Sequence, residues 1–293
     1  MHDRNIYEQV VHIVNVHMQD DDVKRVPTGI ESLDPVLDGG VPPGSVILLA
    51  GEPGAGNREF VYSSVLFLSM MKRKGAERPG IVLPQNIYYA TFTRLSSSIT
   101  EEIKLSFKQD ITEGIEDSIN FIDLSEMYFE SSAVPSEWYS NSSVIERFQK
   151  KSRSGGVIPK LAEVLNESSQ KSLIVLDSIT DIATDSTGIS EWKELIGFLR
   201  GLQRVSKTWD SVIYILLSEG ILAGPRLVEI SDCCDAMVSF RWEESSGRKR
   251  QRIMYFDKFR GVMPHLEEND LVKFAARITP GSGFEVSNIR VVI

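Results

Sequence analysis

A glycine-rich turn between an apolar segment and a helix-forming segment constrains this chain more than any other feature. Residues 45–50 predict a buried strand, and the residues after position 57 favour a helix. The turn has the G-x-x-x-x-G spacing of a phosphate-binding loop, in which backbone N–H groups surround a phosphate. We therefore predict a phosphate loop made of Gly51, Glu52, Pro53, Gly54, Ala55, Gly56, Asn57 and Arg58.

Two positions of this phosphate loop lack the side chains that phosphate chemistry uses. A working loop continues G-K-[ST], with a lysine for the β- and γ-phosphates and a hydroxyl for Mg²⁺. Here Asn57 takes the lysine position, Arg58 takes the hydroxyl position, and Glu59 adds negative charge to the first helical turn. A hydrogen bond to a charged group contributes about 1.5–3 kcal/mol, which the lysine would have supplied. We predict weak nucleotide binding or none, although Arg58 can reach a phosphate from another direction.

Composition narrows the class of protein. The chain has 293 residues, of which 42% are hydrophobic and 25% are charged, as in a globular protein with one large α/β domain or two small ones. A net charge of −9 gives no overall positive field for nucleic acid or an anionic membrane. We find neither a secretion signal nor an uncharged apolar run of about 18 residues, and expect a cytoplasmic protein. The two cysteines, Cys233 and Cys234, are adjacent, which favours a buried pair over disulfides or a metal site.

The first 24 residues differ in character from the rest. They combine an apolar stretch with His12, His17 and the acidic run Asp20–Asp22. The two histidines have no third ligand nearby in the sequence, so we favour an extension that packs on the domain or on a neighbouring subunit over a metal site. Residues 25–293 are predicted to form one domain.

Alternating apolar and helical segments predict an α/β fold. The helix after the phosphate loop should end near residue 74, and Ser98–Glu101 has the pattern of a capping box that opens another helix. Further helices are expected around 158–165 and 192–202. Together with a C-terminal antiparallel hairpin, the segments predict a mainly parallel twisted sheet flanked by helices. The expected strands are 87–92, 120–124, 172–178, 211–217, 234–242, 252–256 and 283–286.

Two segments interrupt this alternation. Residues 125–156 are Ser-rich and unperiodic, and we interpret them as a surface insertion that binds a partner through Trp138 and Tyr139. Residues 245–250 form a basic hairpin tip, which we interpret as a solvated turn rather than a nucleic-acid contact.

The residues before the phosphate loop form a more specific pattern. Thr28-Gly29, Leu33-Asp34, Gly39-Gly40 and Pro43-Gly44-Ser45 precede the G-x-P-G-x-G sequence. This lead-in resembles the KaiC-like branch of the RecA superfamily of P-loop ATPases, and the GEPGAG-x-REF form is similar to its divergent archaeal HTR-like members. The resemblance covers residues 25–293 apart from the insertion. It implies a RecA-like fold, ATP or ADP with Mg²⁺ as ligands, homo-oligomeric assembly, and signalling or motor proteins as partners.

The resemblance can be followed at three further places. Asp177 ends an apolar strand, as does the carboxylate that holds Mg²⁺ when such a protein binds nucleotide. The family's pair of strand-end glutamates, one of which activates water, is replaced by Thr93-Arg94. Lys258 and Arg260 match the K-x-R-G segment that reaches a neighbour's γ-phosphate, although an ion pair with Asp257 is an equally simple interpretation.

Three functions stay open at this stage. The losses at Asn57, Arg58 and Arg94 favour a non-catalytic regulatory or assembly subunit. A slow ATPase or ATP sensor is the alternative, with Arg58 in place of the lysine and Asp177 retained. A DNA-recombination role has the least support, because the chain is acidic.

Overall fold

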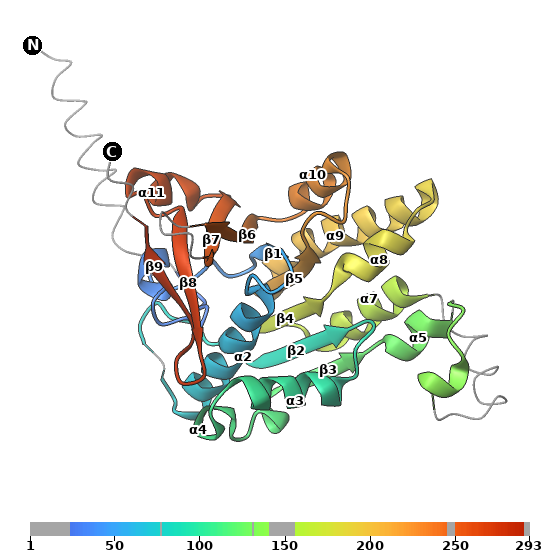
Figure 1. Ribbon diagram of the computed structural model, residues 1–293, viewed down its shortest axis with the longest axis horizontal. Coiled ribbons are helices and arrows are strands. Elements are labelled where there is room, and N and C mark those ends of the chain that lie inside the picture. The colour runs from blue at the N-terminus through green and yellow to red at the C-terminus, as the bar shows by residue number, and fades with distance from the viewer. Residues whose placement is uncertain (1–23, 77, 131, 141–155, 245–249, 290–293) are drawn as a thin grey trace, which may run out of the picture.

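A computed structural model describes residues 24–289 except 77, 131, 141–155 and 245–249 (Figure 1). The histidines of the first segment and most of the basic hairpin tip therefore lie outside the described residues. Within the described part, the chain forms one nine-stranded sheet with helices on both faces. No helix in these described ranges is long and apolar enough to cross a membrane.

The sheet confirms the predicted fold class. Its strand order is β3-β2-β4-β5-β1-β6-β7-β8-β9, with parallel pairing from β3 to β6 and antiparallel pairing from β6 to β9. The strands are β1 (Val46–Gly51), β2 (Asn86–Thr91), β3 (Asn120–Asp123), β4 (Ser172–Asp177), β5 (Val212–Ser218), β6 (Ala236–Glu244), β7 (Arg250–Phe259), β8 (Lys273–Thr279) and β9 (Gly283–Asn288).

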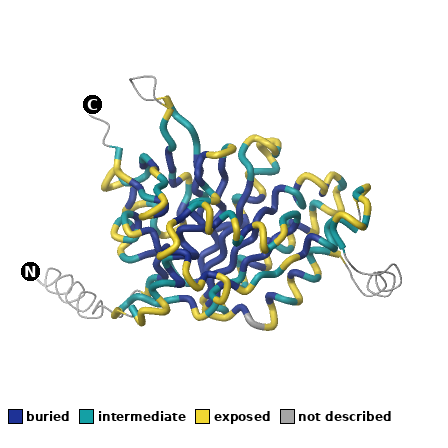
Figure 2. The backbone as a smooth tube through the Cα atoms, turned by 60° about the horizontal axis from the view of Figure 1, so that its bottom comes forward, coloured by how far each residue is buried: buried dark blue, intermediate teal, exposed yellow. Residues whose placement is uncertain are grey.

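Helices cover the two faces of this sheet because the central strands alternate their side chains between two cores. Ile47 and Leu49 of β1 join one hydrophobic core, whereas Val46 and Leu48 join the other. Figure 2 shows the buried chain running through the middle of the molecule. The first core packs against η1 (Asp34–Leu37), α2 (Asn57–Arg73), α3 (Ser96–Ser106), α4 (Gln109–Thr112) and α11 (Met263–Glu268). The second packs against α7 (Val157–Ser168), α8 (Ile179–Asp185), α9 (Ile189–Trp209) and α10 (Gly224–Asp232).

The structure contradicts some of the local predictions and confirms others. The capping box at Ser98–Glu101 is wrong, because α3 begins at Ser96 with Leu95 as its N-cap and has no capping side chain. The insertion is not all loop, since its described part contains α5 (Ser125–Glu130) and η3 (Ser136–Trp138). The cysteine pair is buried and free, as expected. The elements not predicted from the sequence are α4, α8, α10, α11 and β8, and also the short η2 (Glu116–Ser118).

An aromatic cluster fixes the first turns of α2 to the sheet. Phe60 lies 5.9, 5.6 and 5.4 Å, between ring centroids, from Tyr214, Phe240 and Phe284. Phe60 is only 4% exposed, and it follows the phosphate loop directly. Because β5, β6 and β9 all contribute rings, this contact holds the helix that begins at the phosphate loop in one position.

We predict that Phe60→Ala lowers the free energy of unfolding by about 3–5 kcal/mol, since it leaves a cavity in a packed core. Leu105→Ala, at a side chain that is 81% exposed, should change it by less than about 0.5 kcal/mol. Urea unfolding of both variants measures this difference, and equal losses would contradict the role assigned to the cluster.

Candidate functional site: the phosphate loop and its strand ends

The phosphate loop has the backbone of a phosphate cradle. It connects β1 to α2 at the carboxyl end of the parallel strands, where ligands of open α/β sheets bind. Gly54 and Gly56 have φ of 72° and 112°, which side chains rarely tolerate. The space beside Gly54 is open, because a Cβ placed there would meet no atom within 4 Å. The predicted glycine-dependent turn is therefore present.

Asn57 folds back onto this loop. Its Nδ2 lies 3.5 Å from the Leu49 carbonyl, and a Cβ placed on Gly51 would be 2.5 Å from its Cγ. Its Oδ1 accepts a hydrogen bond of 3.0 Å from the Arg58 backbone N–H. That N–H is one of the first-turn donors that a helix offers to an anion. Asn57 thus supplies no charge and occupies a donor that a phosphate would otherwise use.

The β6–β7 hairpin braces the loop from outside. The Trp242 indole N–H donates to the Pro53 carbonyl at 3.2 Å, and Arg252 Nε donates to the Gly54 carbonyl at 3.0 Å. Glu52 accepts a hydrogen bond of 3.1 Å from the Trp242 backbone N–H. The guanidinium groups of Arg250 and Arg252 lie 4.3 and 4.5 Å from the Trp242 ring centroid. Side-chain and backbone oxygens of the loop are therefore held by the hairpin.

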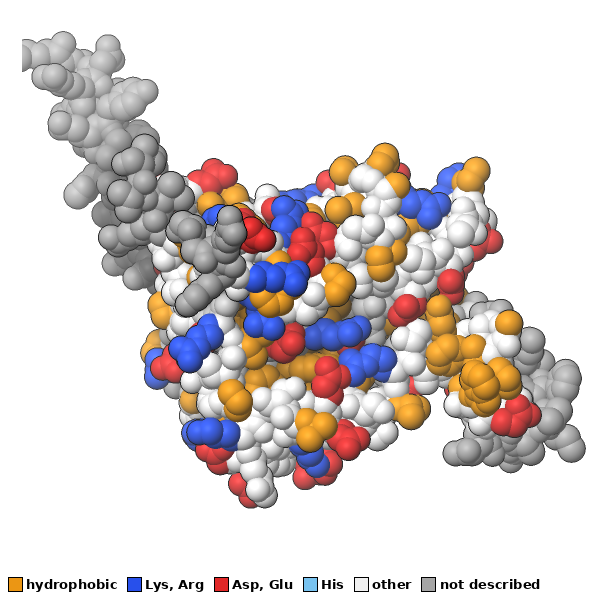
Figure 3. Space-filling model, viewed as in Figure 1, with side chains coloured by type: hydrophobic (Ala, Val, Ile, Leu, Met, Phe, Trp, Pro, Cys, Tyr) orange, Lys and Arg blue, Asp and Glu red, His pale blue; other side chains and the backbone are white. Residues whose placement is uncertain are grey.

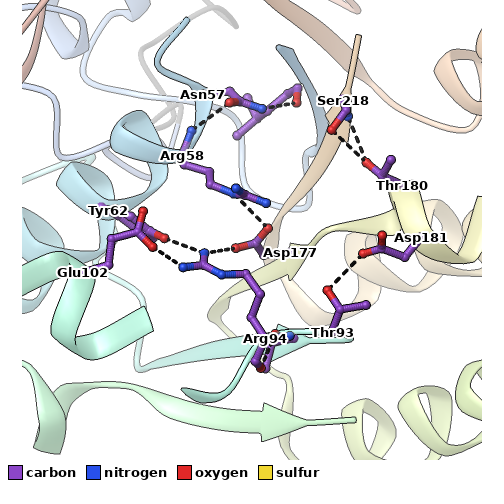
Figure 4. A network of polar contacts seen from close by, with 12 residues as sticks. Asn57, Arg58, Tyr62, Thr93, Arg94, Glu102, Asp177, Thr180, Asp181 and Ser218 are labelled. Carbon is purple, nitrogen blue, oxygen red and sulfur yellow. Dashed lines mark hydrogen bonds and ion pairs between the residues drawn. The ribbon is translucent and has the colours of Figure 1, made fainter. Parts of the chain in front are cut away.

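The buried Asp177 is the centre of an ion-pair network with partly exposed arginines (Figure 4). Its side chain is fully buried at the end of β4. Arg58 Nε lies 3.5 Å from its Oδ1, and Arg94 Nη1 lies 3.6 Å from its Oδ2. The Tyr89 hydroxyl donates a hydrogen bond of 2.7 Å to Oδ2. Asp177 Oδ1 has no hydrogen-bond donor among the described residues, so its compensation is the charge of Arg58.

Arg94 is held in this network from two sides. Its Nη1 donates a hydrogen bond of 3.0 Å to the Tyr62 hydroxyl, and its Nη2 pairs with Glu102 on α3. Burial raises the pKa of Tyr62 to about 12, although Arg94 acts in the opposite direction. Burial, followed by the charge of Asp177, raises the pKa of Tyr89 well above its usual value. Both tyrosines therefore stay protonated at neutral pH, so Tyr89 keeps donating to Asp177 and Tyr62 keeps accepting from Arg94 as a neutral hydroxyl.

The side chains at the metal position of this loop do not fit a metal ion. In P-loop proteins Mg²⁺ is held between the loop hydroxyl and the strand-end aspartate. Here the corresponding positions are Arg58 and Asp177, and the arginine side chain crosses to the aspartate. A cation already faces the carboxylate that would bind the metal. In the described ranges, no group of three or more His, Cys, Asp or Glu side chains could hold a metal ion elsewhere.

A second polar group lies next to this network, and the sequence analysis missed it. Asp181 Oδ2 accepts a hydrogen bond of 3.2 Å from the Thr93 hydroxyl. Burial raises the pKa of Asp181, and the negative charges of Asp185 and Asp177 add to the effect. The spacing of four residues from Asp177 could have indicated it, since α8 begins directly after β4.

Lys258 and Arg260 lie at the other end of the sheet. β7 pairs Phe259 with Ala236, which pairs with Ile47, whereas the phosphate loop follows Gly51 at the opposite end of β1. Within one chain the two cations therefore face away from the phosphate loop.

Both cations bind the C-terminal end of α10. Lys258 Nζ donates to the Ser231 carbonyl at 2.7 Å, and Arg260 Nη2 lies 3.1 Å from the Asp232 carbonyl and 3.4 Å from its Oδ1. A strand-end ion pair is therefore present, but its partner is Asp232 and not the suggested Asp257, which accepts a hydrogen bond from Ser239. Burial lowers the pKa of Lys258, and the charge of Arg260 lowers it further.

The strand order, the phosphate loop and the strand-end aspartate define a RecA-like P-loop fold. Residues 26–288 match the family model described as "ATPase: KaiC". The chain therefore belongs to the KaiC ATPase family. A KaiC-like protein from the archaeon Pyrococcus horikoshii has a similar structure, with a TM-score of 0.58 and 17% identity over 90% of this chain and 99% of that one. At this identity the likeness concerns the fold.

Two curated relatives match short segments only. DNA repair protein RadA of Mycobacterium tuberculosis is 70% identical over 30 residues, which are 10% of this chain and 6% of RadA. A UPF0273 protein of Methanocaldococcus jannaschii is 44% identical over 48 residues, which are 15% of this chain and 20% of that protein. The matched segments span far less than two thirds of either relative.

We predict that Asp181→Asn stabilises the protein at pH 7 and that this gain shrinks as the pH falls towards 4. A raised pKa means that the folded state binds more protons, so the wild-type carboxyl costs stability once the pH rises above its folded pKa. Asparagine keeps an acceptor for Thr93 without the charge. Thermal unfolding of both proteins between pH 4 and 8 tests this, and a gap that does not change with pH would contradict it.

Proposed function

We propose that this KaiC-family protein is a non-catalytic regulatory or assembly subunit in which the binding of Mg-nucleotide is weak or lost. The observation that carries the proposal is the pair of arginines on Asp177. Arg58 and Arg94 bring two guanidinium groups within 3.6 Å of the one strand-end carboxylate. The resemblance to HTR-like proteins supports a role of the signalling or motility type.

Arg58 stands against the binding of Mg²⁺ at Asp177. Two unit charges 4 Å apart interact with about 4 kcal/mol at an effective dielectric constant of 20, and a divalent ion doubles that figure. Mg²⁺ at Asp177 would meet the Arg58 guanidinium with this repulsion unless Arg58 moved away. Its departure would break the native ion pair, and the metal would have to supply the charge that Arg58 now provides to the buried carboxylate oxygen. Metal binding and the native ion pair therefore compete for the same atom.

The site also lacks the family's general base for the attack of water. In the family one of a pair of strand-end glutamates accepts a proton from the attacking water, and Thr93-Arg94 stand in the place of this pair. A guanidinium has donors only and stays protonated in proteins, so it cannot act as a general base. Arg94 is also fixed by Tyr62 and Glu102, which keeps it on Asp177.

A slow ATPase or ATP sensor is the second candidate. It is favoured by the open, glycine-shaped loop at Gly54 and Gly56. In this version Arg58 would leave Asp177 and contact the phosphates in place of the missing lysine. The two candidates differ in one respect that can be measured, because only the second requires Arg58 for nucleotide affinity.

Three further observations concern the oligomeric state, the partner proteins and DNA. A homo-oligomer would give Lys258 and Arg260 a neighbour's phosphate loop to act on, since they face away from their own. Trp138, which is 79% exposed, is a candidate contact for partner proteins. A DNA-recombination role draws only on the short match to RadA. Basic and acidic side chains are interspersed on the face seen in Figure 3, which favours neither DNA nor an anionic surface.

We expect millimolar Mg-ATP to leave the melting temperature of the wild-type protein unchanged. A ligand present at one hundred times its Kd would stabilise the fold by about 2.7 kcal/mol, which shifts a melt by a few degrees. The double variant Asn57→Lys/Arg58→Thr should gain affinity for Mg-ATP by about tenfold or more, because it restores a contact worth about 1.5–3 kcal/mol.

Two single variants serve as controls. Asn57→Lys alone should gain less than the double variant, because Arg58 still faces Asp177. Arg58→Ala separates the candidates: lost nucleotide affinity would favour the ATP sensor, whereas unchanged or increased affinity agrees with the non-catalytic subunit, because the variant removes the guanidinium that faces Asp177. Hydrolysis by the wild-type protein that Asp177→Ala abolishes would contradict the proposal.

A further inference from the structure

An apolar groove lies at the far end of α2 from the phosphate loop. It has a volume of about 550 Å³ and runs between the lead-in residues and the last turns of α2. Phe67, Met70 and Met71 of α2 line it together with Pro35 and Ile81. Phe67, Met70 and Met71 pack on the first core, yet all five side chains remain partly or fully exposed. Large apolar side chains that gather in a surface groove indicate that something covers them.

The described chain begins beside this groove. Arg25 donates its backbone N–H to the Gly80 carbonyl at 2.8 Å and forms a bridge with Ile81, which lines the groove. Residues 1–23 lie outside the described part, and they precede this point directly. The six residues 19–24 can span at most about 20 Å at 3.3–3.6 Å each. A segment ending near residue 18 can therefore reach the groove of its own chain.

The chemistry of that segment matches the groove. Residues 10–18 include Val10, Val11, Ile13, Val14 and Val16, which supply apolar side chains for an apolar lining.

Charged residues are present both in the first segment and in the groove lining. The acidic run Asp20–Asp22 lies between the apolar stretch and the start of the described chain. The groove lining contains the exposed cations Lys74 and Arg78 as well as the acidic Glu31 and Asp34. Lys74 and Arg78 are the lining residues that can pair with the acidic run, and exposed pairs of this kind contribute only about 0–1 kcal/mol each.

We propose that residues 10–18 bind this groove in cis and pack on Phe67, Met70 and Met71. The proposal is independent of the nucleotide question, because the groove and the phosphate loop lie at opposite ends of α2. It also gives the segment a structural effect: α2 begins at Asn57 and Arg58 and ends at Arg73, so a segment bound at one end restrains the helix that carries the site at the other.

Hydrogen exchange of the full-length protein tests this proposal. Val14→Asp should speed amide exchange in residues 67–73 and 78–82 at least threefold, because it places a charge in an apolar groove. Asn15→Asp adds the same charge next to it at a polar position, and should have a much smaller effect. Met71→Asp, on the groove side, should reproduce the effect of Val14→Asp.

A charge reversal gives a second readout. Lys74→Glu/Arg78→Glu should also speed exchange in these residues, and adding Asp21→Lys/Asp22→Lys should restore protection. Equal exchange in the wild type, Val14→Asp and Asn15→Asp would overturn the proposal. Sedimentation velocity distinguishes the source of the segment: if Val14→Asp dissociates an oligomer while exposing the groove, a second copy supplies the segment and binding in cis is wrong.

Discussion

A buried carboxylate with two arginines is the interaction on which the site depends. Asp177 is fully buried at the end of a central strand, where a charge is tolerated only with compensation. Tyr89 donates a hydrogen bond, and Arg58 and Arg94 supply charge from two different helix and strand ends. The network links α2, β2 and β4 directly, and α3 through Glu102. It therefore acts as a structural joint between the elements that, in P-loop proteins, surround a nucleotide.

The rest of the site follows from this joint. The glycines of the phosphate loop keep the backbone shape of a cradle, while the aromatic cluster around Phe60 and the bracing hairpin hold it in place. The fold thus keeps the glycine turn of a phosphate loop, and the Arg58 guanidinium faces the strand-end carboxylate. A scaffold of this kind can serve recognition or assembly without chemistry, because fold alone does not determine function.

Much of the fold could be predicted from the sequence, because buried parallel strands are continuous apolar runs and the phosphate loop fixes where one of them ends. Strand β8 was missed because its alternating, partly exposed residues give a weaker signal. The false capping box at Ser98–Glu101 has the local pattern of a helix start, but the helix already begins at Ser96, with Leu95 as its N-cap.

The site shows the same division between local and tertiary information. The losses at Asn57, Arg58 and Arg94 are visible in single positions. That Arg58 and Arg94 converge on Asp177 is not visible, since the three residues lie on different elements and only the sheet order brings them together. The contacts of Lys258 and Arg260 with α10 likewise depend on the packing of that unpredicted helix.

The most direct test of the central claim is to count bound metal. Electron paramagnetic resonance of Mn²⁺, titrated with the wild-type protein in the presence of ATP, distinguishes protein-bound metal from Mn-ATP free in solution. If the Arg58 guanidinium holds the metal position, the wild type should bind no Mn²⁺ at the site, and Arg58→Thr should bind about one equivalent that Asp177→Asn removes. Stoichiometric Mn²⁺ on the wild-type protein that depends on Asp177 would contradict the account.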